Sequence, residues 1–172
     1  AANVDIKSTN DLTLGAIAMT GNLTAEALAG SVTVAGAISK TSGADATLTL
    51  KATQDIVTND SITSTANKLH TVFWVDSDAS NGGFVWLGSS AAITTNGGHL
   101  WMGGSDTAGG STTWNGLTVG NGYAKGRDDA TGIPTGVWID DGAIYTAGGH
   151  IMVRGQSAAT VDSAPQTPDA GT

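Results

Sequence analysis

Short stretches in which apolar and polar residues alternate recur along almost the whole chain. The apolar members of these stretches are separated by one residue, as in Val4-Ile6, Leu12-Leu14, Val32-Val34, Leu48-Leu50, Val85-Leu87, Leu100-Met102, Leu117-Val119, Val137-Ile139 and Ile151-Val153. Successive side chains of a β-strand point to opposite faces, so a period of two is typical of a half-buried strand. Only "LTAEALAG", Leu23 to Gly30, has a helix-like composition, and it is too short for more than about one helical turn. The pattern predicts an all-β protein built from short strands.

One stretch of the sequence is written twice. "ITTNGGHLWMGG" runs from Ile93 to Gly104 and "IYTAGGHIMVRG" from Ile144 to Gly155, and the two share an isoleucine, a threonine, a Gly-Gly-His core and a final glycine. An isoleucine after a small residue marks a looser repeat at Ile38, Ile62, Ile93 and Ile144, with separations of 24, 31 and 51 residues. Irregular periods of about 20 to 30 residues, short strands and polar turns are typical of a β-solenoid. An antiparallel sandwich also has many short strands, but it has no reason to reuse a turn sequence.

A solenoid buries the apolar residues of successive coils in stacks inside the molecule. At about 25 residues per coil, the chain makes roughly six or seven irregular coils. The last interval of the repeat equals about two units, or one unit that carries an insertion at residues 105–134. We expect the core to consist of Ile38, Leu48, Leu50, Ile62, Leu69, Val85, Leu87, Ile93, Leu100, Met102, Val137, Ile139, Ile144 and Ile151.

The composition is that of a single β-rich domain with many glycine turns. The chain has 172 residues, of which 40% are hydrophobic, 13% are charged, 25 are Gly and 3 are Pro. We expect a β-solenoid domain over residues 1–155, with the insertion at 105–134, and an extended tail over residues 156–172. The first residues, "AANVDIKSTNDLTLG", already look like the middle of a strand-turn pattern, so we expect a processed chain or a piece of a longer one.

The charge balance narrows the range of partners. The formal net charge is -8 and the sequence has no basic cluster, which argues against binding to nucleic acid or to an anionic membrane. There is no apolar run of about 18 residues, so we expect no membrane insertion. The absence of Cys excludes disulfides and thiolate metal sites.

Several stretches resemble the repeat regions of large bacterial exoproteins of the filamentous-haemagglutinin type. They are "GAISKTSGADATLTLKATQDI", "SITSTANKLHTVFWVDSDASNGGFVWLGSSAAITTNGGHLWMGG" and the second Gly-Gly-His copy, so the resemblance covers Ala35 to Gly104 and Gly136 to Gly155. It implies a right-handed parallel β-helix that is exported to the bacterial cell surface or secreted, and that serves as a stalk, fibre or adhesin. It identifies no catalytic residue.

One loop has the residue types of a cation site. In "VDSDASNGG", the residues Asp76, Asp78, Ser80 and Asn81 supply oxygen atoms at the close spacing that calcium accepts. The EF-hand pattern requires glycine at the sixth position of its loop, where this sequence has Asn81. The alternative is a turn stabilised by hydrogen bonds from Asx side chains. We expect no other cofactor.

Other candidate groups for catalysis have simpler interpretations. The acidic pairs Asp128-Asp129 and Asp140-Asp141 have the residue type that glycosidases use, but adjacent side chains on a strand point to opposite faces, which favours solvated turns. Lys125, Arg127 and Asp128 in "AKGRDD" resemble the basic residues of polysaccharide lyases, and nothing around them makes this specific. His70, His99 and His150 are too few and too widely spread in the sequence to indicate a metal site, although His99 and His150 occupy equivalent repeat positions and could stack on one face. We therefore expect no enzymatic activity.

The tryptophans are candidates for an interaction surface. If Val85 and Leu87 face inward, Trp86 faces outward, and the same parity places Trp74, Trp101 and Trp138 on the outer surface. A soluble protein rarely leaves such a patch uncovered. The four indoles are therefore covered by the insertion, stacked on sugar rings, or buried against a neighbouring subunit.

These observations leave three hypotheses about function. The first is a structural module of a surface fibre or adhesin, which self-associates end to end or belongs to a longer parent chain, with the tail lying along a neighbouring copy or along its own outer face. The second is a glycan-binding β-helix that uses the exposed indoles to bind a glycan or a host surface receptor. The third is a β-helix enzyme that degrades polysaccharides.

Overall fold

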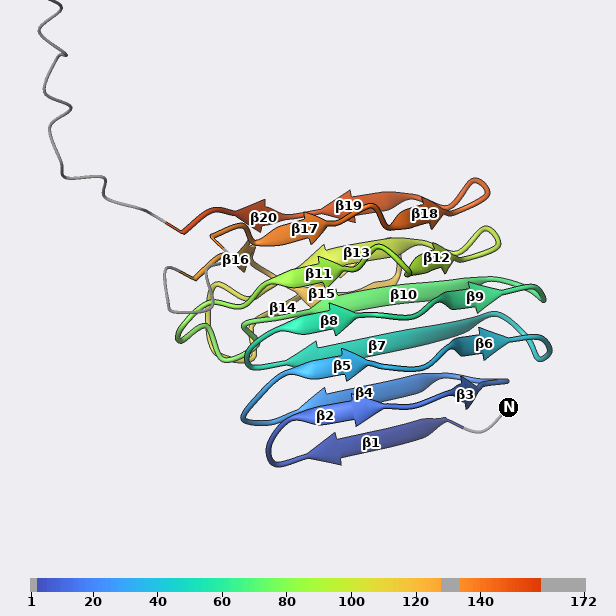
Figure 1. Ribbon diagram of the computed structural model, residues 1–172, viewed down its shortest axis with the longest axis horizontal. Helices are drawn as coiled ribbons and strands as arrows, with labels where there is room; N and C mark the ends of the chain where they lie inside the picture. Colours follow the sequence, from blue (N-terminus) through green and yellow to red (C-terminus); the bar gives the residue numbers. More distant parts are fainter. Residues whose placement is uncertain (1–2, 128–133, 159–172) are drawn as a thin grey trace, which may run out of the picture.

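The alternating stretches form strands, and the strands stack into three parallel sheets (Figure 1). The computed structural model describes residues 3–127 and 134–158, and within these ranges it contains strands and turns but no helix. None of these segments is therefore a helix long and apolar enough to cross a membrane. The chain passes through the three sheets in turn, once per coil, and forms a right-handed parallel β-helix. The predicted fold class is confirmed.

Each sheet takes one strand from each coil. Sheet A contains β1 (Val4–Ser8), β4 (Leu23–Ala27), β7 (Ala46–Ala52), β10 (Leu69–Trp74), β13 (Leu100–Gly103) and β19 (Ile151–Val153). Sheet B contains β2 (Leu12–Leu14), β5 (Val32–Val34), β8 (Ile56–Thr58), β11 (Val85–Leu87) and β17 (Val137–Ile139). Sheet C contains β3 (Ile17–Ala18), β6 (Ile38–Lys40), β9 (Ile62–Ser64), β12 (Ala92–Thr94) and β18 (Ala143–Tyr145). In the described part of the chain, five coils thus enter all three sheets, and β19 begins a sixth.

The stretch with a helix-like composition is a strand. β4 pairs with β1 on one side and with β7 on the other, and its residues Leu23, Ala25 and Ala27 are buried. Two parallel neighbours satisfy the backbone N–H and C=O groups of this segment and bury its apolar side. These gains outweigh the helix preference of Ala, Glu and Leu, which is a few tenths of a kcal/mol per residue, on the order of 0.5.

Residues that pair in register stack in columns along the helix axis. In sheet C the inward column consists of isoleucines: Ile17, Ile38, Ile62, Ile93 and Ile144. Ile38, Ile62 and Ile93 are fully buried. The isoleucine that marks the repeat in the sequence is therefore the core residue of this sheet, and each copy packs against the same branched side chain in the next coil.

The predicted core is confirmed in the earlier coils and wrong in part of the last one. Ten of the fourteen predicted residues are fully buried, namely Ile38, Leu48, Leu50, Ile62, Leu69, Val85, Leu87, Ile93, Leu100 and Met102. Val137 and Ile144 are partly buried against this core, whereas Ile139 is 43% and Ile151 is 50% exposed. These four residues have a coil on one side, and no further coil covers them within the described residues.

The stretch that occurs twice forms the turn from sheet C to sheet A. In the first copy, Thr95 Oγ1 donates a hydrogen bond to the Gly98 carbonyl at 2.6 Å, and Asn96 and Gly97 have φ angles of 50° and 88°. A Cβ added to Gly98 would collide with the Leu69 carbonyl of the coil below. The second copy repeats each of these features. The shared letters are therefore the residues that a tight turn between stacked coils requires.

The predicted insertion contains a β-hairpin. β14 (Ser111–Trp114) and β15 (Leu117–Gly120) pair antiparallel through a two-residue turn at Asn115 and Gly116, whose φ angles of 47° and 79° suit such a turn. A short parallel pair, β16 (Ala124–Lys125) and β20 (Gly155–Gln156), follows. Residues 128–133 of the insertion and the predicted tail from residue 159 onward lie outside the described residues.

Candidate functional site

Two of the four predicted surface tryptophans are buried under the hairpin. Trp74 and Trp101 point outward from sheet A, but they pack against Leu117 and Val119 of β15 and are 6% and 1% exposed. Trp74 Nε1–H donates a hydrogen bond to Ser105 Oγ at 2.7 Å, so the buried indole is satisfied. Covering by the insertion, one of the three predicted alternatives, is thus confirmed for these two residues, which belong to a second core on this face of sheet A and not to an exposed interaction surface.

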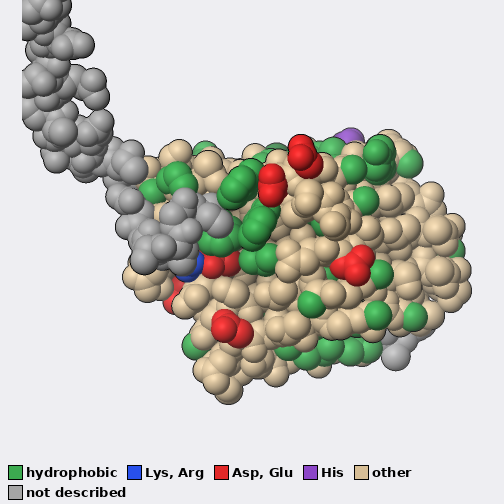
Figure 2. All heavy atoms as spheres, in the orientation of Figure 1, with side chains coloured by type: hydrophobic (Ala, Val, Ile, Leu, Met, Phe, Trp, Pro, Cys, Tyr) green, Lys and Arg blue, Asp and Glu red, His purple; other side chains and the backbone are tan. Residues whose placement is uncertain are grey.

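The other two tryptophans remain on the surface of sheet B. The rings of Trp86 and Trp138 stack with centroids 5.7 Å apart and 14° between their planes, and Trp138 is 42% exposed. Figure 2 shows hydrophobic side chains gathered along the edge over β17 and β18 and along the opposite edge near β1, while the surface between is mainly uncharged and polar. The exposed aromatic surface of sheet B is thus confined to its last two coils.

The acidic loop after β10 is held together by its own side chains. The Ser80 backbone N–H donates to Asp76 Oδ1 at 3.1 Å, and Ser80 Oγ donates to Asp78 Oδ2 at 2.8 Å. Asn81 Nδ2 donates to Ser80 Oγ at 3.2 Å, and Lys125 Nζ lies 3.8 Å from Asp76 Oδ2. The predicted side-chain bonding within this turn is present. Calcium binding by Asp76, Asp78, Ser80 and Asn81 stays a prediction.

Electrostatics at this loop centre on Asp76. Burial raises the pKa of the Asp76 carboxyl group, and the nearby Lys125 opposes this rise. A cation bound here would have to replace Lys125 as the partner of the carboxylate. Within residues 3–127 and 134–158, no three His, Cys, Asp or Glu side chains lie close enough together to hold a metal ion.

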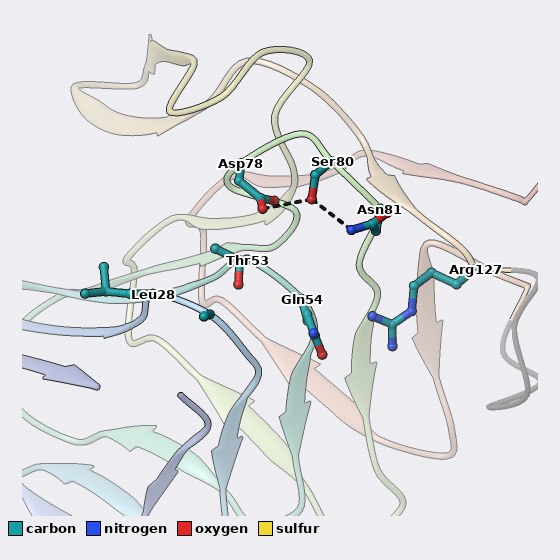
Figure 3. Close-up of a pocket in the computed structure, with 8 residues that line it drawn as sticks. Leu28, Thr53, Gln54, Asp78, Ser80, Asn81 and Arg127 are labelled. Carbon is teal, nitrogen blue, oxygen red and sulfur yellow. Dashed lines mark hydrogen bonds between the residues drawn. The ribbon is translucent and has the colours of Figure 1, made fainter. Parts of the chain in front are cut away.

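A cavity of about 200 Å³ opens beside the same loop (Figure 3). It is lined by Leu28, Ala29, Thr53, Gln54, Asp78, Ser80, Asn81 and Arg127. Arg127 Nη2 donates to Asp55 Oδ2 at 2.6 Å, which ties the segment after β16 to the third coil. Among the described lining residues, Asp78 is the single carboxylate and none is a histidine, so these residues do not supply the pair of carboxyl groups that glycoside hydrolysis uses.

Of the other catalytic candidates, Arg127 lines this cavity, whereas Asp140, Asp141 and Lys125 are not among its described lining residues. Asp140 and Asp141 follow β17 in a turn, where Asp141 has a φ angle of 55°. The pair Asp128-Asp129 lies outside the described residues. Lys125 faces Asp76 and Arg127 faces Asp55, so both basic residues of the "AKGRDD" stretch have acidic partners.

The three histidines form one ladder at the start of sheet A. The ring centroids of His70 and His99 are 5.0 Å apart, and those of His99 and His150 are 4.9 Å apart. The backbone N–H of His99 donates to His70 Nδ1 at 3.0 Å, and the backbone N–H of His150 donates to His99 Nδ1 at 2.9 Å. The predicted stacking of His99 on His150 is present, and His70 is a third member that the sequence did not reveal.

The equivalence of His70 to the other two histidines is not apparent from the sequence because the turn before His70 is longer. It follows its marker Ile62 by eight residues, whereas His99 follows Ile93 by six. The signal available in the sequence is Ser64, which occupies the position of Thr95 and likewise bonds a carbonyl three residues on, that of Asn67, at 2.9 Å. An alignment anchored on this Ser/Thr position, with the longer turn allowed, brings the histidines into line.

His70 and His99, the first two histidines of the ladder, favour the neutral form. Burial lowers the pKa of His70, and the neighbouring His99 lowers it further. Burial also lowers the pKa of His99, with contributions from His150 and Lys68. His70 and His99 are therefore uncharged at neutral pH.

We found no match to this chain among protein-family models, curated proteins or solved structures. The resemblance to filamentous-haemagglutinin repeats stays a prediction. The structure itself establishes the β-helix fold, and function has to be argued from its surfaces and its ends.

Proposed function

We propose that this chain is a structural module of a bacterial cell-surface or extracellular fibre or adhesin, non-catalytic, in which coil stacks join end to end. The observation that supports this most directly is that the apolar columns run through the described coils and remain open at both ends. The resemblance in sequence supports the cellular location.

The last coil presents apolar side chains that earlier coils bury. Ile151 and Val153 continue the columns of Leu100 and Met102, which are fully buried, yet they are 50% and 45% exposed. Ile139 continues the column of the buried Leu87 and is 43% exposed. These residues occupy core positions that no further coil covers within the described residues.

The first coil presents a complementary surface. Val4 is 49% exposed, and a hollow of about 240 Å³ with a mainly apolar lining, including Ile6, Ile17 and Met19, opens beside it. Within the described residues β1 pairs on one edge only, with β4, so its other edge offers backbone N–H and C=O groups to a partner strand.

The two ends match in register. Val4 and Ile151 belong to one column of sheet A, and Ile6 and Val153 belong to the next. A neighbouring module whose β1 pairs in parallel with β19 would place these residues against each other and continue the columns. The neighbour is a second copy of this chain, or further coils of a longer parent chain.

Light scattering and electron microscopy at micromolar concentration test assembly of this chain. We expect oligomers or filaments from the wild type and monomers from Ile151→Asp, because a charge at this edge would be buried unpaired in the joint. Ile151 is half exposed in a single copy, so the variant should keep its fold by circular dichroism. Thr118→Asp, on the exposed side of the hairpin, is the matched control and should assemble like the wild type. A wild type that is already monomeric contradicts end-to-end assembly.

Truncation separates the edge from the predicted tail. Deleting residues from Ser157 onward leaves both sheet edges in place. If the sheet edges make the joint, the truncated chain assembles like the full one. Loss of assembly on truncation would instead assign the joint to the tail.

Glycan binding is the second candidate, supported by the exposed stack of Trp86 and Trp138. Aromatic faces of this kind pack against sugar rings. A polysaccharide array probed with the wild type and with Trp138→Ala tests it. Binding that the variant loses, and that Thr118→Ala keeps, would establish this function, and no binding by the wild type would exclude the polysaccharides on the array.

A further inference from the structure

The tip of hairpin β14–β15 rests on the histidine ladder. Asn115 Nδ2 lies 2.9 Å from His150 Nδ1, and the Trp114 ring meets the His99 ring edge to face, with centroids 5.7 Å apart. The base of the insertion is held separately, for example by the Gly109 N–H, which donates to the Ser77 carbonyl at 2.7 Å. The tip thus contacts the imidazoles, and Trp114 also packs against the cluster around Trp74 and Trp101, whereas the base has its own anchors.

The ladder works only while each Nδ1 carries a lone pair. His70 Nδ1 and His99 Nδ1 each accept a backbone N–H, so the proton of each neutral ring is on Nε2. The same tautomer in His150 lets its Nδ1 accept a hydrogen bond from Asn115 Nδ2. Protonation of Nδ1 replaces each acceptor with a donor that faces another donor, and it places positive charges on stacked rings.

We propose that the ladder of His70, His99 and His150 is a pH-operated latch that holds the hairpin closed over sheet A at neutral pH and releases its tip in acid. The latch does not depend on the proposed fibre role, since its contacts form within one copy, although His150 directly precedes β19 of the last coil. Its release frees Trp114, which packs against the cluster of Trp74, Trp101, Leu117 and Val119.

The charged groups around the ladder influence the pH at which the hairpin opens. Asp45, in the turn before β7, favours the charged form of His70, whereas Lys68, before β10, disfavours it in both His70 and His99. Burial and the neighbouring rings add to the effect of Lys68, and the pKa values of His70 and His99 lie below the ordinary 6.5. On the hairpin side, the facing groups are the uncharged Trp114 and Asn115.

The sign of the pH dependence follows from these lowered pKa values. An opened state, in which His99 loses its contact with Trp114 and its pKa moves back toward the ordinary 6.5, binds protons more readily than the closed state does. The closed state keeps its full stability above that pH and loses it as the pH falls through the lowered values. The hairpin is thus closed at neutral pH and opens in mild acid.

Hydrogen exchange of residues 111–120, followed by mass spectrometry and corrected for the intrinsic effect of pH, measures the opening. Between about pH 7.5 and about pH 4.5 we expect protection of this segment to fall about two- to tenfold, the shift that corresponds to one lost hydrogen bond. Protection of β7 and β10 should change less, because these strands lie inside the coil stack. Equal protection of residues 111–120 at both pH values overturns the proposal.

Two variants distinguish protonation of the histidine ladder from other effects of acid on the hairpin. The triple change His70→Asn, His99→Asn and His150→Asn keeps an acceptor for each N–H and cannot be protonated, so its hairpin should keep its protection in acid. Asn115→Gly keeps the positive φ of the turn and removes the contact with His150, so its protection should already be low at neutral pH. A triple variant that opens in acid like the wild type overturns the proposal.

Imidazole nitrogen NMR of the wild type gives a test that needs no variant. At neutral pH we expect His70 and His99 to carry their proton on Nε2, with Nδ1 as the acceptor. On acidification, the gain of the second proton should coincide with the loss of hairpin protection. A neutral ring with its proton on Nδ1, or opening at a different pH from ring protonation, contradicts the latch.

Discussion

Truncation of Ile93 to alanine probes the isoleucine column of sheet C. Ile93 is fully buried and pairs with Ile62 on one side and Ile144 on the other. Core Ile→Ala substitutions cost about 2–5 kcal/mol, and the upper part of this range applies where the site cannot collapse. Neighbours held in register on both sides prevent collapse here, so we expect a loss of about 3–4 kcal/mol.

Ile144 provides the matched comparison within the same column. It is partly buried and has a described neighbour on one side only, so Ile144→Ala should cost about 1–2 kcal/mol. Thr94→Ala, at the outward position of β12, should change stability by about 0.5 kcal/mol or less.

Urea denaturation followed by circular dichroism measures all three variants. With a slope of about 2 kcal/mol per molar urea, Ile93→Ala should lower the midpoint by about 1.5–2 M. Ile93→Asp adds an unpaired buried charge, which costs several kcal/mol more, on the order of 3, and should abolish the β signal. Equal losses for Ile93→Ala and Ile144→Ala, or an Ile93→Asp protein that melts within a degree or two of the wild type, would refute the assigned column.

Three further substitutions or additions test other parts of the structure. Trp101→Ala should cost about 3–5 kcal/mol and Trp138→Ala about 1 kcal/mol or less in thermal melts, since the first indole lies beneath the hairpin and the second at the surface; similar losses would contradict the second core. Gly98→Ala should lower the melting temperature because its Cβ meets the Leu69 carbonyl, whereas Gly15→Ala, with open space around it, should be neutral or stabilising by up to about 1 kcal/mol. Calcium should leave the melting temperature unchanged, because Asp76 already bonds the Ser80 N–H and faces Lys125; a rise that Asp78→Asn removes would instead establish the calcium loop.

Much of the fold can be predicted from the sequence because the patterns that determine the strands and turns are local. Alternation of apolar and polar residues reports which side of each strand faces the core, and this identified the ten fully buried members of the predicted core. The duplicated Thr-x-Gly-Gly-His stretch indicates a turn that occurs in two successive coils, since positive φ angles and close backbone contacts restrict the residues allowed there. The coils of a β-solenoid repeat the same kind of strand and turn, so several parts of the sequence independently indicate the same local structure.

The candidate sites depended on contacts that no local pattern encodes. Strand parity correctly turns Trp74 and Trp101 away from the coil interior, but parity says nothing of what lies over that side. Leu23 to Ala27 became a strand because β1 and β7 flank it, and His70 joined the ladder through register with His99 rather than through its spacing from Ile62. The hairpin that buries the two indoles and reaches the histidines comes from a later part of the chain, and its docking depends on side chains supplied by three coils. Burial and hydrogen bonding at these residues are properties of the assembled stack, because each depends on the coil or hairpin that packs against it.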